Sequence, residues 1–228
     1  MSAPPSKAVV IAVDGPAASG KGTISRRLAQ HFHFAHMDSG ALYRLTALAV
    51  VEAGGDPANE ADALSGAATI DLSRAGDPAI RTAEIGTAAS RVSAIPAVRA
   101  ALHDYQIAFI TDPPGGSKGA VMDGRDIGTV IAPHATAKLF IEARPEVRAH
   151  RRWLELAGMG IAKDEALLLA EILARDEADR TRPISPLRPA PDAALLDTSD
   201  LAIDAAFAVA LALVSPRVEG ALKDRHRG

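Results

Sequence analysis

Short apolar runs alternate along the chain with longer segments of helical periodicity. Five apolar runs have the length and composition of buried strands: 8–13, 34–37, 119–122, 138–141 and 193–196. Six segments with helical periodicity separate or follow them: 21–31, 39 to about 53, 96–110, 145–157, 163–181 and 201–214. This alternation predicts an α/β fold in which helices cover both faces of a parallel sheet.

Two parts of the chain lack such regularity. The segment 56–93 contains several Gly and Pro residues and predicts irregular structure. The charged tail after Pro216 predicts a frayed end. The length of 228 residues fits a single domain, 1–228, with a small mobile insert.

Composition narrows the class of protein. Hydrophobic residues make up 48% and charged residues 23%, as in a soluble globular protein. A net charge of −3 and only 4% aromatic residues argue against a nucleic-acid partner. Without cysteine the chain forms no disulfide and no thiolate metal site. The apolar runs at 8–13 and 205–214 are too short to span a bilayer, so we expect a cytoplasmic protein without a membrane partner.

A glycine-rich segment joins the first predicted strand to the first predicted helix. It has the spacing G-x-x-x-x-G-K and consists of Gly15, Pro16, Ala17, Ala18, Ser19, Gly20, Lys21, Gly22 and Thr23. Glycines let backbone amides turn toward phosphate oxygens, the helix N-terminus adds a positive dipole end, and Lys21 adds a cation. The segment predicts a P-loop NTPase. The hydroxyl comes one place late, at Thr23, so we expect it to serve phosphate or a magnesium-bound water.

Polar residues follow the second and third predicted strands. Asp38-Ser39-Gly40, with Tyr43-Arg44 beyond, ends the second, and Asp123-Gly124-Arg125-Asp126 ends the third. Ligands of open α/β sheets bind at the carboxyl ends of strands, so both motifs are candidates for a binding site. Asp123 occupies the position where P-loop enzymes are expected to have a carboxylate near magnesium, and Arg125 can bind phosphate. The alternatives are a plain helix cap at Asp38 and a charged turn at Asp123.

A third cluster lies late in the chain. Arg175, Asp179 and Arg182 share one helix face. An i,i+4 ion pair with one solvated arginine is the alternative interpretation. Several more arginines lie in the same half, which suits a site that gathers phosphates: Arg148, Arg151, Arg152 and Arg180.

Several of these stretches resemble bacterial cytidylate kinases, and the resemblance covers most of the chain from Val9 to about Ser199. The stretches that carry it are Val13 to Thr23, Met37-Asp38-Ser39-Gly40-Ala41-Leu42-Tyr43-Arg44, Asp123-Gly124-Arg125-Asp126-Ile127-Gly128-Thr129-Val130, Glu146 to Arg152 and Arg175 to Leu187. The resemblance implies transfer of the γ-phosphoryl group of ATP to CMP, and also to dCMP. It further implies Mg²⁺ with ATP, held mainly by phosphates and waters, and we expect a monomer.

The resemblance also assigns residues. Those implied to bind CMP are Ser39, Arg44, Ser90, Arg99, Arg125, Asp126, Arg175, Asp179 and Arg182. Those expected to take part in catalysis are Lys21, Asp123, Arg125 and Arg182. The segment 56–93 resembles the acceptor-binding insert of the family, shortened between Leu72 and Ile80, and 148–182 is expected to act as a lid with glycines at 158 and 160. An ordinary interhelix turn is the alternative for those glycines.

Three other functions remain open on the sequence. One is a small P-loop kinase for a different acceptor, such as AMP, UMP, shikimate or a coenzyme precursor. Another is a nucleotide-dependent regulatory module with weak hydrolysis. An RNA-binding role fits least, because no basic stripe is present. Base selection has a chemical rationale, since the exocyclic amine of cytosine donates to a carboxylate such as Asp126 and the uracil carbonyl does not.

Overall fold

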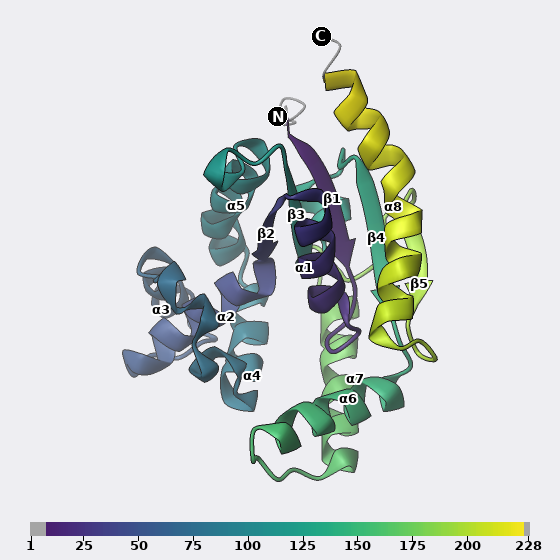
Figure 1. Cartoon of the computed structure of the whole chain (residues 1–228). Helices are drawn as coiled ribbons and strands as arrows, with labels where there is room; N and C mark the ends of the chain where they lie inside the picture. Colours follow the sequence, from purple (N-terminus) through teal and green to yellow (C-terminus); the bar gives the residue numbers. More distant parts are fainter. Residues whose placement is uncertain (1–7, 226–228) are drawn as a thin grey trace. The chain divides into compact units, whose positions relative to one another are not determined.

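The computed structural model describes residues 8–225 and contains a five-stranded sheet in the order β2-β3-β1-β4-β5 (Figure 1). The strands are β1 (Val9–Asp14), β2 (Ala35–Asp38), β3 (Gly119–Gly124), β4 (Ala137–Glu142) and β5 (Ala194–Asp197). The pairings of β1 with β3, β1 with β4 and β4 with β5 are all parallel. The predicted parallel α/β fold is confirmed, and the bounds of each strand lie within two residues of the expected ones.

The helices follow the predicted alternation. They are α1 (Lys21–Phe32), α2 (Ser39–Glu52), α3 (Glu60–Ala68), α4 (Ala83–Ala94), α5 (Pro96–Thr111), α6 (Pro145–Gly158), α7 (Glu165–Thr181) and α8 (Ile203–Arg225). Four shorter helical segments are η1 (Leu72–Gly76), η2 (Pro78–Arg81), η3 (Pro114–Gly116) and the π-helical η4 (Ile127–Ile131). The described residues divide into two compact units, one comprising 8–37 with 110–225 and the other Asp38–Phe109.

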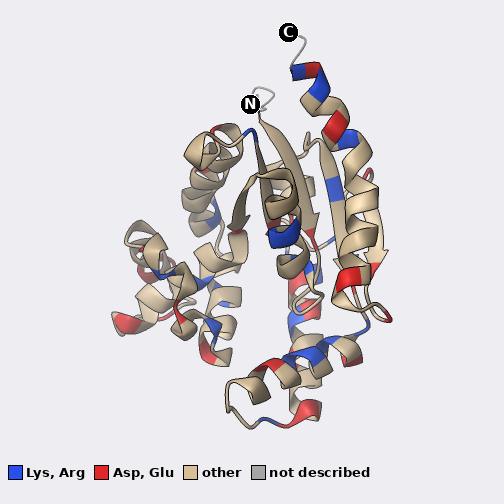
Figure 2. Ribbon diagram, in the orientation of Figure 1, with Lys and Arg blue, Asp and Glu red and all other residues tan. Residues whose placement is uncertain are grey.

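Strand β1 lies in the middle of the sheet, and all six of its residues are buried. Side chains alternate between the two faces of a strand. On one face Val9, Ile11 and Val13 join a core to which α1 and α8 contribute apolar side chains. Asp14 belongs to the other face, where η4 contacts β1 and β3. Figure 2 shows the strands mostly without charged residues, whereas acidic and basic residues alternate along α6 and α7.

Helices α6 and α7 pack against each other as a hairpin. Their apolar contact consists of Ala149, Leu156, Leu168 and Ile172, with Trp153 and Leu169 at its margin. Asp164 caps α7 by accepting hydrogen bonds from the amides of Ala166 and Leu167. Gly160, in the turn between the helices, has a φ of +75°, a conformation that favours glycine.

The segment 56–93 is more regular than the sequence predicts. It contains α3, η1, η2 and α4, and the prediction of irregular structure is wrong for most of it. Asn59 caps α3 and Thr82 caps α4, each through a side-chain oxygen that accepts a backbone amide. Both helices are rich in Ala, the residue with the highest helix propensity, which outweighs the Gly and Pro residues of the segment. Between Leu72 and Ile80 the chain forms 3₁₀ turns rather than strands.

The last helix is also longer than predicted, because α8 runs through Pro216 to Arg225. Val214 and Val218 are buried in the core on either side of the proline. Packing therefore extends the helix beyond the position where local propensity predicts its end. Among residues 8–225, α8 is the one helix long and apolar enough to cross a membrane by length and composition. Four of its residues face the sheet: Ala206, Ala210, Val214 and Val218.

Helices α2 and α3 approach closely at Gly66, in the Asp38–Phe109 unit. A Cβ atom there would lie 2.6 Å from Val50 Cγ2 and 2.8 Å from the carbonyl oxygen of Thr46. We expect Gly66→Ala to lower the free energy of unfolding by about 1–2 kcal/mol, because overpacking outweighs the gain in helix propensity. Urea unfolding measures the change. Gly76→Ala, where a Cβ meets nothing within 4 Å, is the control and should stay within about 0.5 kcal/mol of the parent.

Candidate active site

The glycine-rich loop between β1 and α1 has an unusual backbone. Gly15 passes so close to β4 that a Cβ atom would lie 2.0 Å from the carbonyl oxygen of Ile141. Ala18 and Gly20 are left-handed, with φ values of +58° and +88°. Gly20 is the N-cap of α1 and has no side chain to cap it. The loop thus brings backbone amides to the N-terminus of a helix, the arrangement that binds anions.

The carbonyl groups of this loop are bound by side chains. The oxygen of Pro16 accepts a hydrogen bond from Lys21 Nζ at 3.2 Å, that of Ala17 from Arg148 Nη1 at 3.1 Å, and that of Ser19 from Thr198 Oγ1 at 3.0 Å. In a trans peptide the carbonyl points away from the next amide. Holding these three oxygens therefore directs the amides of Ala17, Ala18 and Gly20 to the opposite side.

Asp123, at the carboxyl end of β3, lies close to the beginning of α1. Its Oδ1 atom is 3.8 Å from the position of a Cβ on Gly22, and the side chain is buried. The other oxygen is 2.9 Å from His36 Nε2 on β2. His36 thus orients the Asp123 carboxylate, a contact that sequence reasoning missed because it joins two strands 87 residues apart.

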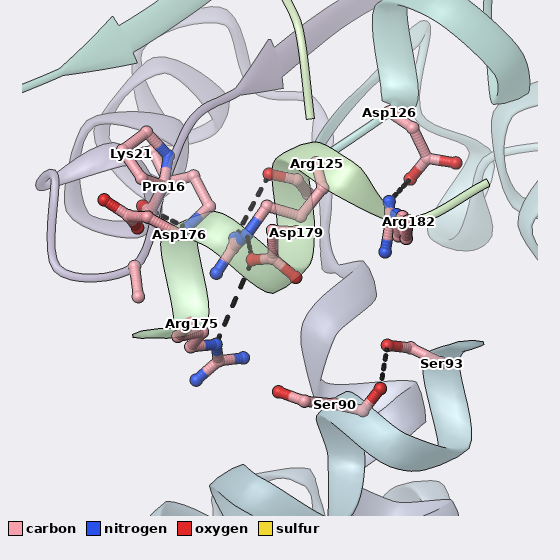
Figure 3. Close-up of polar contacts among 12 residues, drawn as sticks. Pro16, Lys21, Ser90, Ser93, Arg125, Asp126, Arg175, Asp176, Asp179 and Arg182 are labelled. Carbon is pink, nitrogen blue, oxygen red and sulfur yellow. Dashed lines mark hydrogen bonds and ion pairs between the residues drawn. The ribbon is translucent and has the colours of Figure 1, made fainter. Parts of the chain in front are cut away.

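Acidic and basic residues meet between the end of β3 and the last turns of α7 (Figure 3). Arg125 Nε donates to Asp179 Oδ2 at 2.8 Å, and Arg175 Nε lies 4.0 Å from the same oxygen. Arg182 Nη2 lies 3.6 Å from Asp126 Oδ1. The structure therefore brings together the five residues that sequence analysis placed after β3 and on one face of α7.

The arginines of this cluster favour the ionised form of Asp179. Burial alone would raise the pKa of Asp179, but Arg125, Arg175 and Arg182 together hold it below its ordinary value. The carboxylate thus stays charged at neutral pH and orients the arginines.

The other expected residues lie in the Asp38–Phe109 unit. Ser39 is the first residue of α2 and is buried. Arg44 donates to the carbonyl oxygen of Ile80 at 2.6 Å. Arg99 stacks over the ring of Tyr43, with 5.6 Å from its guanidinium carbon to the ring centroid. On α4, the Ser90 hydroxyl donates to Gly86, and the Ser90 carbonyl accepts from the Ser93 hydroxyl (Figure 3).

Three of the surplus arginines have structural partners. Arg148 and Arg151 contact the backbone at Ala17 and Thr198, and Arg152 pairs with Glu155 on its own helix. The expectation that these arginines serve phosphates stays a prediction. The partners of Arg148 and Arg151 are distant in sequence, so spacing gives no sign of them, whereas Arg152 and Glu155 form an i,i+3 pair that spacing does suggest.

Asp14 joins the loop after β1 to the segment after β3. Its carboxylate accepts hydrogen bonds from the amides of Ile127 at 2.8 Å and Gly128 at 2.7 Å. These amides belong to the two residues after Asp126, so Asp14 fixes the path of the backbone that follows β3 and carries Asp126. A carboxylate at the end of an otherwise apolar strand was the available signal for this role.

Few side chains near the phosphate loop could bind a magnesium ion. Among residues 8–225 no group of three or more His, Cys, Asp or Glu residues is arranged to hold a metal. The buried carboxylate of Asp123 lies beside the loop, whereas that of Asp14, just before Gly15, accepts the amides of Ile127 and Gly128. One carboxylate fits a magnesium ion that takes its other ligands from phosphates and waters.

The burial of Asp14 generates a pH prediction. Burial raises the pKa of Asp14 to about 7 from an ordinary 3.8, against the two amides, which lower it. Between these values the native state binds a proton that the unfolded chain has lost. The free energy of unfolding therefore falls as pH rises through this range, by up to ~1.4 kcal/mol per pH unit.

Asp14→Asn, which is neutral at every pH, should remove this slope in urea unfolding measured at about pH 5 and about pH 7. Asp200→Asn is the matched control, because Arg144 holds the pKa of Asp200 below its ordinary value and that residue stays charged throughout. Equal slopes in the parent and Asp14→Asn would contradict the prediction.

Comparison with known proteins identifies the family. The sequence model of the family described as cytidylate kinase matches residues 11–215. The cytidylate kinase of Nitrobacter winogradskyi is 53% identical over 206 residues, which cover 90% of this chain and 95% of that protein. The cytidylate kinase of Afipia carboxidovorans is 53% identical as well, covering 90% of this chain and 97% of its own.

Among solved structures, an uncharacterized protein from Eubacterium ventriosum has a TM-score of 0.50 at 12% identity, covering 91% of this chain and 98% of that one. At that identity the likeness concerns the fold alone. The family match spans most of the chain, and both relatives align with nine-tenths of it, so the chain belongs to the cytidylate kinase family.

Proposed function

We propose that this enzyme transfers the γ-phosphoryl group of ATP to CMP, and also to dCMP, yielding ADP and the cytidine diphosphate. The observation that carries the proposal is the phosphate loop before α1, with Lys21 at its end, in a chain 53% identical to two cytidylate kinases. We further propose that the enzyme is cytoplasmic, acts as a monomer and serves pyrimidine nucleotide metabolism.

The loop Gly15 to Thr23 binds the triphosphate of ATP. Its directed amides and the N-terminus of α1 supply hydrogen bonds and a positive end to phosphate oxygens. In the structure Lys21 Nζ donates to the Pro16 carbonyl. With ATP bound, Lys21 exchanges this weak contact for the β- and γ-phosphates.

Transfer needs no covalent enzyme intermediate. An oxygen of the CMP phosphate attacks the γ-phosphorus, the bond from that phosphorus to the β–γ bridging oxygen breaks, and ADP leaves. The chain contributes positioning and positive charge, through Lys21, Arg125 and Arg182. Asp123 would hold Mg²⁺, directly or through water, and the hydroxyl of Thr23 would bind a phosphate oxygen or a magnesium-bound water. When bound, the metal neutralises charge on the phosphates.

The CMP residues divide between the two units. Ser39, Arg44, Ser90 and Arg99 belong to Asp38–Phe109, and the others are Arg125, Asp126, Arg175, Asp179 and Arg182. We propose that Arg44 and Arg125 bind the CMP phosphate and that Ser39 and Asp126 bind the base. The ion pair of Arg125 with Asp179 supports phosphate binding by Arg125. Asp179 accepts from Nε and so fixes the orientation of the guanidinium, whose planar shape suits a phosphate.

Two segments complete the proposal. The segment 56–93, within the Asp38–Phe109 unit, acts as the acceptor-binding insert. The segment 148–182, which comprises most of α6 and α7, acts as a lid that excludes water during transfer.

ADP release with a panel of acceptors tests the function. Purified enzyme with ATP and magnesium should turn over fastest with CMP and dCMP, and more slowly with UMP, AMP or shikimate. A rate that no acceptor stimulates would instead indicate the regulatory module with weak hydrolysis. Gel filtration measures the oligomeric state.

Lys21→Ala should reduce turnover with CMP by at least a thousandfold, about the size of losing a main charge contact to the transferred group. The fold should persist, because the hydrogen bond that Lys21 donates to Pro16, at 3.2 Å, lies within its own loop. Circular dichroism and steady-state ADP release check both points. Lys118→Ala, at an exposed position far from the loop in sequence, should keep parental activity.

Asp126→Asn should narrow the preference for CMP over UMP. A carboxylate facing the uracil carbonyl sets acceptor against acceptor, which costs about 1–3 kcal/mol, whereas an amide can donate to it. The ratio of kcat/KM for the two acceptors measures the preference, and it should fall about tenfold or more. An unchanged ratio would show that Asp126 does not select between the two bases. Asp200→Asn, on the exposed surface, is the control.

A further inference from the structure

Arg148 is the largest fully buried side chain of the described residues, with a relative exposure of 1%. Its Nε donates to the carbonyl oxygen of Ala143 at 2.8 Å, just before α6 begins. Its Nη1 donates to Ala17 at 3.1 Å and to Asp176 Oδ1 at 3.0 Å. Nη2 donates to the second oxygen of Asp176. One guanidinium thus connects the segment between β4 and α6, helix α7 and the phosphate loop.

Asp176 makes this arrangement possible. It is 2% exposed, and its two oxygens both accept from Arg148. A buried charge is tolerated when it is paired and its remaining donors are satisfied. Each guanidinium nitrogen of Arg148 has at least one acceptor, and Nη1 donates to the loop as well as to Asp176. Lysine cannot reproduce it, because an ammonium group lacks the planar fork.

The hydrogen bond to Ala17 acts at the most strained point of the loop. Ala18 is left-handed, a conformation that costs an alanine roughly 1 kcal/mol. The Ala17 carbonyl and the Ala18 amide belong to the same planar peptide and point in opposite directions. By holding the oxygen outward, Arg148 keeps the Ala18 amide directed into the loop, where a phosphate oxygen would accept it.

We propose that Arg148, held by Asp176, is a positioning residue for ATP: it fixes the Ala17–Ala18 peptide and so makes the affinity for triphosphate depend on α6 and α7. This rests on the proposed role of the loop as the ATP site. A purely structural ion pair would support the fold without favouring one substrate over the other. The two interpretations differ in which substrate loses affinity.

Arg148→Lys distinguishes them. We expect its dissociation constant for a non-hydrolysable ATP analogue, measured by calorimetry, to rise about tenfold, the size expected for losing a hydrogen bond from a charged donor. The KM for ATP should rise in parallel, whereas the KM for CMP should stay within twofold. Equal increases for both substrates, or an unchanged ATP affinity in a folded variant, would overturn the proposal.

Arg144→Lys is the matched control. Arg144 lies four residues earlier and forms a similar two-point pair with Asp200, at 2.9 and 2.6 Å, but on the exposed surface and away from the loop carbonyls. Its ATP affinity should equal that of the parent. If the parent enzyme itself binds no ATP analogue, the proposed function fails, and that outcome is separate from the comparison of the variants.

Hydrogen exchange on the parent enzyme keeps the proposal testable if Arg148→Lys does not fold. Because the Arg148 contact links the loop to α6, the ATP analogue should slow exchange in 145–152 as well as in 15–23. Protection confined to the loop would overturn the coupling.

Discussion

A planar peptide cannot point its carbonyl and the following amide in the same direction, and the phosphate loop is arranged around this constraint. To present amides to an anion, the loop must turn carbonyls away from it, and buried carbonyls need donors. Lys21, Arg148 and Thr198 supply them to Pro16, Ala17 and Ser19. The anion site therefore depends on side chains from α6 and from the turn after β5, which lie more than a hundred residues away.

The sheet places the second half of the site next to the first. Since β1 and β3 are parallel neighbours, their carboxyl ends meet, and the segments that follow them are adjacent. Asp14 uses this adjacency by accepting the amides of Ile127 and Gly128. The same residue precedes Gly15, so the start of the phosphate loop and the position of Asp126 are fixed by one buried carboxyl group.

Sequence analysis recovered what is encoded locally. The strands, the phosphate loop and most helices follow from continuous patterns, and each appears within a few residues of its expected position. Two expectations failed where packing or capping overrides the pattern: α8 continues through Pro216 because Val218 is buried, and 56–93 forms helices begun by Asn59 and Thr82. The partners of Arg148 and His36 were not predictable, because their contacts join residues far apart in the chain. The roles of Ser39, Arg44, Ser90 and Arg99 came from the family resemblance alone and stay predictions.

Helix α7 connects the two halves of the site within one compact unit. Over seven residues it offers Asp176 to Arg148, Asp179 to Arg125, and Arg182, just past its end, to Asp126. An α-helix is stiff over two turns, so these contacts cannot shift independently. The parts of α6 and α7 that carry these contacts are thus bound to the phosphate loop and to the segment after β3. Among the hydrogen bonds described for 8–225, the turn at Gly158 and Gly160 makes only backbone contacts within itself and with the end of α6. Closure of the proposed lid should therefore involve the distal turn and the apolar contact of Leu156 with its α7 neighbours, and leave the ends near the sheet in place.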